Sequence, residues 1–207
     1  MKKLLTGLFA MLSVFLAGTA FADRVFQASE MYAGPGSTAE GAQGAAWLRR
    51  SPAGIHGRVM VNVDNSDTAY SIWWVVFNNP EYCAGAALEP PQPCGLPDLF
   101  NPLVHAAVFN ASGAISAATS TGGVINVDLQ LKAGEGSFKG HAPFPPFPPE
   151  LGLPDINGVL GKKNGCGAEI HIDVNQHSIF DTDWVTELTQ PEGETHRFAI
   201  FPAVHCK

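Results

Sequence analysis

The stretch that decides the fold reads Ala69-Tyr70-Ser71-Ile72-Trp73-Trp74-Val75-Val76-Phe77-Asn78-Asn79. It is rich in aromatic and β-branched residues, which favour β-strands. Alternate residues of a strand point to opposite faces. One face would carry Ser71, Trp73, Val75 and Phe77, and the other Tyr70, Ile72, Trp74 and Val76. Since both faces are apolar, we predict a central strand that is covered on both sides, with both tryptophans packed in the interior.

Other segments alternate between apolar and polar residues with a period of two. The clearest are 57–63, 124–131 and 168–175, and each is predicted to bury one face. Charged residues make up only 15% of the chain, which has 22 Gly and 16 Pro, so short strands and long loops are favoured over helices. We predict an all-β antiparallel β-sandwich of roughly eight strands, with at most one short helix near residue 181. A closed barrel is the alternative.

Turn-forming residues predict how the strands connect. Asp64-Asn65-Ser66-Asp67 separates 57–63 from the central strand and predicts a β-hairpin. Ala111-Ser112-Gly113 is expected to turn the chain after a strand over 103–110. Residues 47–52 are expected to place a hydrophobic anchor at a turn, and residues 23–31 to form an edge strand.

The N-terminus has the pattern of a signal peptide. Lys2 and Lys3 precede an apolar run over 4–17, and Ala20-Phe21-Ala22 is a cleavage signal. A single domain over 23–207 is therefore expected in the periplasm or outside the cell, with no transmembrane segment. The leader holds two Lys and no acidic residue, so the formal charge changes from −7 to −9 on its removal. An acidic chain without a basic cluster is not expected to bind nucleic acid.

Four cysteines in an oxidising compartment predict two disulfides. Three pairings are possible, and we favour Cys83–Cys94 and Cys166–Cys206. The first closes a short proline-rich loop, and the second ties the C-terminus to the body. No C-x-x-C spacing is present, which argues against a cysteine metal site or a redox-active pair.

Linear catalytic motifs are missing from the sequence. It has no nucleophile elbow, no His-Glu-x-x-His, no phosphate-binding glycine loop and no dinucleotide fingerprint. Our leading interpretation is a binding or structural module without catalysis.

A metal-binding protein or metalloenzyme is the second interpretation. The outward face of 168–175 carries Glu169, His171 and Asp173, and His177 follows. Imidazole and carboxylate groups suit Cu or Zn. Alternate strand residues lie about 6.5–7 Å apart, so other segments would have to complete the site. The candidate ligands are His171, Asp173 and His177, together with His105, His141 or His56. A polar solvent face without an ion, or a general acid–base role, are the alternatives.

A carbohydrate-interacting module is the third interpretation. Trp47 and Trp184 are the candidate exposed platforms, since an exposed ring can stack on a sugar. The proline-rich segment 142–149 is expected to form polyproline II, which places Phe144 and Phe147 on one face. These two rings would either dock a protein partner or pack onto the protein's own sheet.

Two stretches carry a resemblance to known proteins. The first is Trp73-Trp74-Val75-Val76-Phe77-Asn78-Asn79-Pro80-Glu81, with Cys83 and Pro93-Cys94-Gly95 after it. It resembles a group of secreted bacterial proteins whose activity is not established. The second, Gly167-Ala168-Glu169-Ile170-His171, is similar to strands of the CHRD module, a β-rich extracellular domain. The resemblance implies a fold and an extracytoplasmic address, and it brings no catalytic residue.

Overall fold

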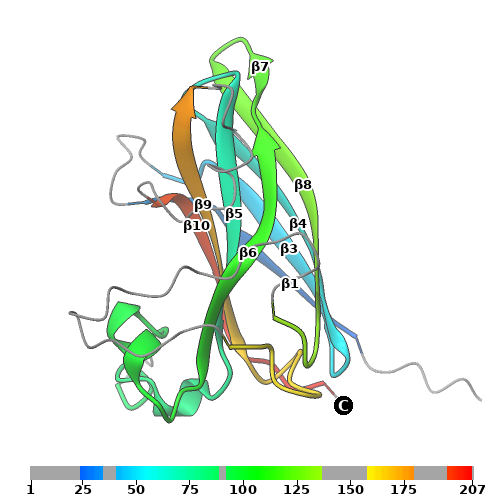
Figure 1. The fold of residues 1–207 in the computed structure, drawn as a ribbon, viewed down its shortest axis with the longest axis vertical. Coiled ribbons are helices and arrows are strands. Elements are labelled where there is room, and N and C mark those ends of the chain that lie inside the picture. The colour runs from blue at the N-terminus through cyan, green and yellow to red at the C-terminus, as the bar shows by residue number, and fades with distance from the viewer. Residues whose placement is uncertain (1–23, 35–40, 89–91, 137–157, 180–194, 207) are drawn as a thin grey trace, which may run out of the picture.

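A computed structural model describes residues 24–34, 41–88, 92–136, 158–179 and 195–206. Within these residues the chain forms ten strands, arranged as two antiparallel five-stranded sheets that pack face to face (Figure 1). The all-β sandwich predicted from the sequence is confirmed. In the part of the chain described, no helix is long and apolar enough to cross a membrane.

The two sheets are named A and B. Sheet A has the order β1 (Val25–Glu30), β3 (Gly44–Ser51), β4 (Gly54–Val63), β8 (Gly122–Lys132) and β7 (Ala117–Thr119). Sheet B has the order β2 (Tyr32–Ala33), β10 (Thr195–Phe201), β9 (Glu169–Ile179), β5 (Thr68–Phe77) and β6 (Ala106–Ile115). Two short 3-10 helices, η1 (Pro80–Tyr82) and η2 (Leu96–Phe100), follow β5.

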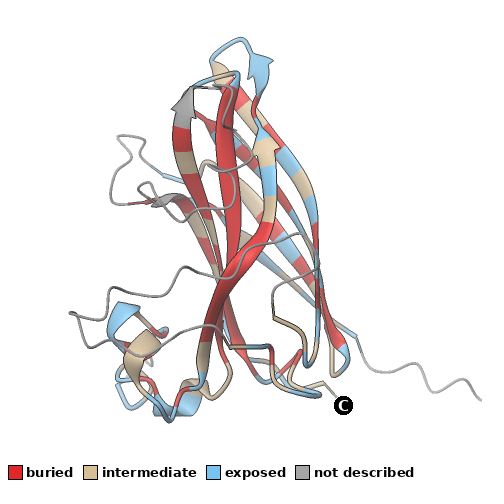
Figure 2. Cartoon of the chain, viewed as in Figure 1, coloured by how far each residue is buried: buried red, intermediate tan, exposed pale blue. Residues whose placement is uncertain are grey.

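Strand β5 is the central strand that its sequence predicts. All ten of its residues are buried (Figure 2). Tyr70, Ile72, Trp74 and Val76 belong to the core between the sheets, whereas Trp73, Val75 and Phe77 pack on the outer side of sheet B. Their cover there includes the Cys83–Cys94 disulfide and Val104. We call residues 80–88 and 92–104 the stapled loop.

Both flanks of the sandwich are sealed by a strand that changes sheet. Strand β1 at the edge of sheet A passes through Met31 into β2 at the edge of sheet B. Met31 is buried and exchanges backbone hydrogen bonds with Gln43 and Gly44. On the opposite flank, β6 passes through buried Ser116 into β7, and Ser116 bonds to Thr68. These two crossings partly close the sandwich at its flanks. Full closure would have given the barrel that was the alternative prediction.

The predicted hairpin between β4 and β5 is wrong. Strand β4 pairs with β3 and β8, and β5 pairs with β6 and β9, so residues 64–67 connect the two layers. The difference follows from burial. Sheet A leaves one face in solvent and suits the alternating pattern of β4, whereas β5 needs a cover on both faces.

Two further local predictions are wrong. Residues 111–113 do not turn, because β6 runs on to Ile115. Asn110 lies opposite Trp73 and Ser112 lies opposite Ile72, so one extra residue is taken up in a β-bulge. Residues 47–50 do not lie at a turn but form part of β3, whose period is hidden by Arg50 at an inward position.

Arg50 joins β3 to the C-terminal region. Its buried guanidinium donates hydrogen bonds to the backbone carbonyls of Gly165, Cys166, Ala168 and Pro202, and to the side chain of Gln27. Burial lowers the pKa of Arg50 to about 10, although the Glu169 carboxylate opposes the shift. The Arg50 guanidinium thereby joins β3 to residues 165–168 and to Pro202.

Both predicted disulfides are confirmed. Cys83 and Cys94 lie 5.3 Å apart between Cα atoms, and Cys166 and Cys206 lie 5.9 Å apart. The first holds the stapled loop and the second fixes the C-terminal segment beside Arg50. Two disulfides fit an oxidising environment.

Candidate functional site

Strand β9 carries a row of polar side chains on the outer face of sheet B. As the sequence predicts, its apolar residues face the core. The polar row does not form a solvent face, because Glu169 is 6% exposed and His177 is 9% exposed. Any chemistry of this row therefore takes place in an enclosed environment.

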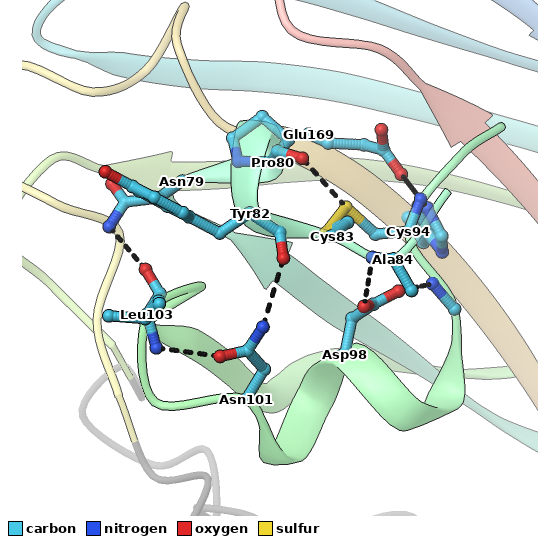
Figure 3. The surroundings of a disulfide bond; sticks show 12 residues. Asn79, Pro80, Tyr82, Cys83, Ala84, Cys94, Asp98, Asn101, Leu103 and Glu169 are labelled. Atoms are coloured by element: carbon cyan, nitrogen blue, oxygen red, sulfur yellow. Dashed lines mark hydrogen bonds and ion pairs between the residues drawn. A yellow bond between two sulfur atoms is a disulfide. The ribbon is translucent and has the colours of Figure 1, made fainter. Parts of the chain in front are cut away.

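The part of the row at the start of β9 is held by the stapled loop. Glu169 Oε1 accepts a hydrogen bond from the backbone N–H of Cys94 at 2.7 Å (Figure 3). The same oxygen lies 2.7 Å from His171 Nε2. The ring of His171 packs against that of Phe77, with 4.9 Å between the ring centroids. His171 is thus held by a carboxylate and an aromatic ring.

Asp173 lies opposite Trp73 on β5. Burial raises the pKa of its carboxyl to about 6, and the neighbouring His171 opposes this rise. Removal from water disfavours the carboxylate more than the imidazole stabilises it. Asp173 therefore changes its charge near pH 6.

Ser71 on β5 contacts His177, which lies in the part of the row toward the end of β9. The indole N–H of Trp73 donates a hydrogen bond to Ser71 Oγ at 2.7 Å, and His177 Nε2 lies 2.7 Å from the same oxygen. Contact between a serine hydroxyl and an imidazole is the first requirement of an activated nucleophile. Here all three residues are buried. The sequence-based reading missed Ser71, because only the register of β5 against β9 brings it to His177.

The candidate metal ligands do not gather in the described part of the chain. There, the three-donor group whose ligand atoms lie within 4.8 Å of one another is Cys83, Cys94 and Asp98. Both sulfurs belong to a disulfide. The Asp98 carboxylate accepts the backbone N–H groups of Ala84 and Gly95 at 2.8 and 2.7 Å (Figure 3). This group braces the stapled loop.

The remaining candidate ligands lie apart from one another. His105 lies at the start of β6 with a left-handed backbone φ of 50°. His56 is exposed on sheet A. His141 lies outside the described residues. A Cu or Zn site on β9 therefore stays a prediction.

The predicted carbohydrate platforms have different outcomes. Trp47 is 40% exposed on the outer face of sheet A. Trp184 lies outside the described residues, as do Phe144 and Phe147 of the proline-rich segment. Trp73 and Trp74 are buried, as predicted.

The outer face of sheet A carries a diagonal line of apolar side chains. Phe26 on β1 pairs with Arg49, Trp47 pairs with Arg58, and Met60 pairs with Asn126. Along its own strand, each apolar residue lies two positions from the residue that pairs with the previous one. The three side chains are therefore diagonal neighbours on the same face. Phe26 is 74% exposed and Met60 is 46% exposed. The line, which we call the apolar diagonal, is Phe26, Trp47, Met60 and the half-buried Val124 of β8.

Polar side chains border the apolar diagonal on one side. Arg58 Nε donates to Asn126 Oδ1 at 2.9 Å and lies 3.9 Å from the carboxylate of Asp128. His56 and Gln130 pair with each other in the next row. The other side is bordered by two small residues, Ala28, which pairs with Trp47, and Ala45, which pairs with Met60. The face thus combines apolar contact area with hydrogen-bonding groups.

Comparison of the chain with protein-family models, with curated proteins and with solved structures gives no match.

Proposed function

We propose that this protein is a binding module of the periplasm or cell exterior, and that a neutral carbohydrate chain lies across the outer face of sheet A. The observation that carries the proposal is the apolar diagonal, which crosses the neighbouring strands β1, β3, β4 and β8. Exposed apolar side chains that are contiguous and rimmed by polar groups mark interaction surfaces.

The chemistry of this face matches that of a sugar chain. Sugars present apolar ring faces, which suit the rings of Phe26 and Trp47, and hydroxyl groups, which both donate and accept hydrogen bonds. Arg58 supplies donors, Asp128 supplies acceptors, and Gln130 supplies both. A diagonal over several strands favours an extended ligand over a compact one, because successive contacts repeat along a line.

Charge and address support the choice of a neutral ligand. The signal-peptide pattern over 1–22 directs the chain to an oxidising compartment, and the two disulfides fit that environment. Removal of this leader leaves a formal charge of −9, from −7 less the two Lys that it contains. A polyanionic polysaccharide would be repelled by such a chain.

Affinity electrophoresis tests the proposal. The protein, purified without a histidine tag, is run in native gels that contain xylan, laminarin, dextran, a soluble cellulose ether or, as the anionic comparison, alginate. We expect retardation by at least one neutral polysaccharide, and roughly tenfold or greater loss of affinity in Trp47→Ala, as is typical when an aromatic anchor is truncated. Phe26→Ala should weaken binding further.

The control is Tyr82→Ala. This side chain is 51% exposed on η1, away from sheet A, and its removal should leave binding unchanged. Quenching of tryptophan fluorescence gives a second readout. Trp47 is exposed to a ligand on sheet A, whereas Trp73 and Trp74 are buried. Equal mobility of the wild type and Trp47→Ala in every gel, at equal thermal stability, would overturn the proposal.

A further inference from the structure

A cavity of about 950 Å³ lies where β5 ends, between the stapled loop and the segment that precedes β9. One wall consists of Leu99, Phe100 and Pro102, and the other includes Val159 and Lys162. Its volume falls within the range of small-molecule sites, which are about 300–1,000 Å³. The cavity is distinct from the outer face of sheet A, since none of its described lining residues belongs to that sheet.

A single amide ties the two walls together. Asn78 Nδ2 donates to the backbone carbonyl of His105 at 2.7 Å and to that of Val159 at 2.9 Å. Asn78 Oδ1 accepts the N–H of Gly161 at 2.7 Å. Asn164 in turn donates to the backbone carbonyl of Asn78 at 2.8 Å. These bonds hold the cavity open in a fixed shape, and preorganisation of this kind favours ligand binding.

His105 is fixed at the cavity in an uncommon conformation. Its φ of 50° lies in the left-handed region, which His105 shares with two other non-glycine residues of the described chain, Asp67 and Lys163. The Asn78 hydrogen bond to its carbonyl and the bond from Asn79 N–H to the next carbonyl upstream, that of Val104, secure the backbone there. His105 is exposed and lines the cavity.

The charge of the lining is opposite to that of the chain. The protein has a formal charge of −7, yet among the described residues that line the cavity none is acidic, and Lys162 and His105 are the titratable ones. Both are exposed and offer N–H donors. The four asparagines of the lining engage the backbone or one another, so they shape the walls. Apolar contact comes from Leu99, Phe100, Pro102 and Val159.

We propose that this cavity binds a small amphipathic anion, in which a carboxylate or sulfonate adjoins a flat apolar group. The anionic group lies near Lys162 and His105, and the apolar group contacts Phe100 and Val159. Charge-assisted hydrogen bonds supply orientation, and the apolar walls exclude water from them. This site is independent of the carbohydrate face.

A matched pair of fluorescent probes tests the site. Anilinonaphthalene sulfonate carries an anion on a flat aromatic body, and N-phenyl-1-naphthylamine is its neutral counterpart. We expect the wild type to bind the anionic probe at least about tenfold more tightly, the equivalent of one charge-assisted hydrogen bond. The double variant Lys162→Gln/His105→Gln should remove this preference and leave affinity for the neutral probe unchanged.

Lys163→Gln is the matched control. It makes the same change of charge one residue away, at a position that does not line the cavity, and should preserve the preference for the anion. Trp47→Ala should also preserve it, which separates this site from the carbohydrate face. Backbone amide shifts in an NMR titration should centre on residues 99–105 and 158–164. Shifts centred elsewhere, equal affinity for the two probes, or no binding of either would overturn the proposal.

Discussion

The carboxylate of Glu169 accepts the backbone N–H of Cys94 at 2.7 Å, and this bond docks the stapled loop onto the outer face of sheet B. Glu169 is the first residue of β9, and Cys94 belongs to the disulfide that covers Phe77. Strand β9 is thereby joined to the loop that follows its neighbour in sheet B, strand β5. The docked loop covers the apolar outer side of β5.

Truncation of this carboxylate should destabilise the loop. Glu169→Ala leaves the buried Cys94 N–H without its acceptor, and we expect a loss of about 1–3 kcal/mol in the free energy of unfolding. Glu169→Gln keeps an acceptor oxygen and should lose less. Urea unfolding followed by tryptophan fluorescence measures both. Equal losses in the two variants would contradict the assigned role of the hydrogen bond.

Removal of the Cys83–Cys94 disulfide should loosen the same cover. The bond spans a sequence separation of 11, and in the chain-entropy model its loss costs about 3 kcal/mol. In the double variant Cys83→Ser/Cys94→Ser, Trp73 loses part of its apolar surroundings, so its emission should shift to the red. Unfolding in urea gives the energy, and an unchanged emission maximum would show that the loop stays docked without the disulfide.

Asp173 should make the stability depend on pH. Because burial raises its pKa from 3.8 to about 6, the folded state binds more protons than the unfolded state between these values. Stability contributed by the neutral form is complete below about pH 4 and is lost as the pH rises through 6, up to about 3 kcal/mol. Asp173→Asn should therefore be more stable than the wild type at pH 7. The gain should vanish near pH 4 in urea titrations, and a gain that is the same at both pH values would refute the assignment.

Arg50 should tolerate little change. Its guanidinium satisfies carbonyls from several segments, and a shorter or apolar side chain would leave these buried acceptors unpaired. We expect Arg50→Met to lose roughly 3 kcal/mol or more, as for other disrupted buried charge networks. Arg49→Met, on the solvent side of the same strand, is the control and should change stability by less than about 0.5 kcal/mol. Thermal and urea unfolding compare the two.

The periodic pattern predicted much of the fold but not its strand pairing. Strands β4, β8 and β9 follow the alternation of apolar residues, and β5 follows its continuous apolar run, because burial of a face depends on local sequence. The partner of a strand depends on the whole sheet. Residues 64–67 have the composition of a hairpin turn, yet they connect two layers, since a turn sequence does not specify which strands pair. Strand β3 was missed because a buried arginine interrupts its apolar period.

The candidate sites were predictable only in part. Trp47 is exposed as predicted, but the sequence placed it at a turn, whereas it lies within β3. The contact between Ser71 and His177 depends on the register between two strands that are distant in sequence, and no local signal encodes it. The cavity at Lys162 depends on how a loop and an irregular segment meet, which the sequence pattern does not specify.

The crossings at Met31 and Ser116 have a mechanical consequence. Each flank of the molecule is one continuous strand that belongs to both layers, so neither layer can slide over the other or separate without breaking backbone hydrogen bonds at both flanks. The two sheets should consequently unfold together, in one cooperative transition.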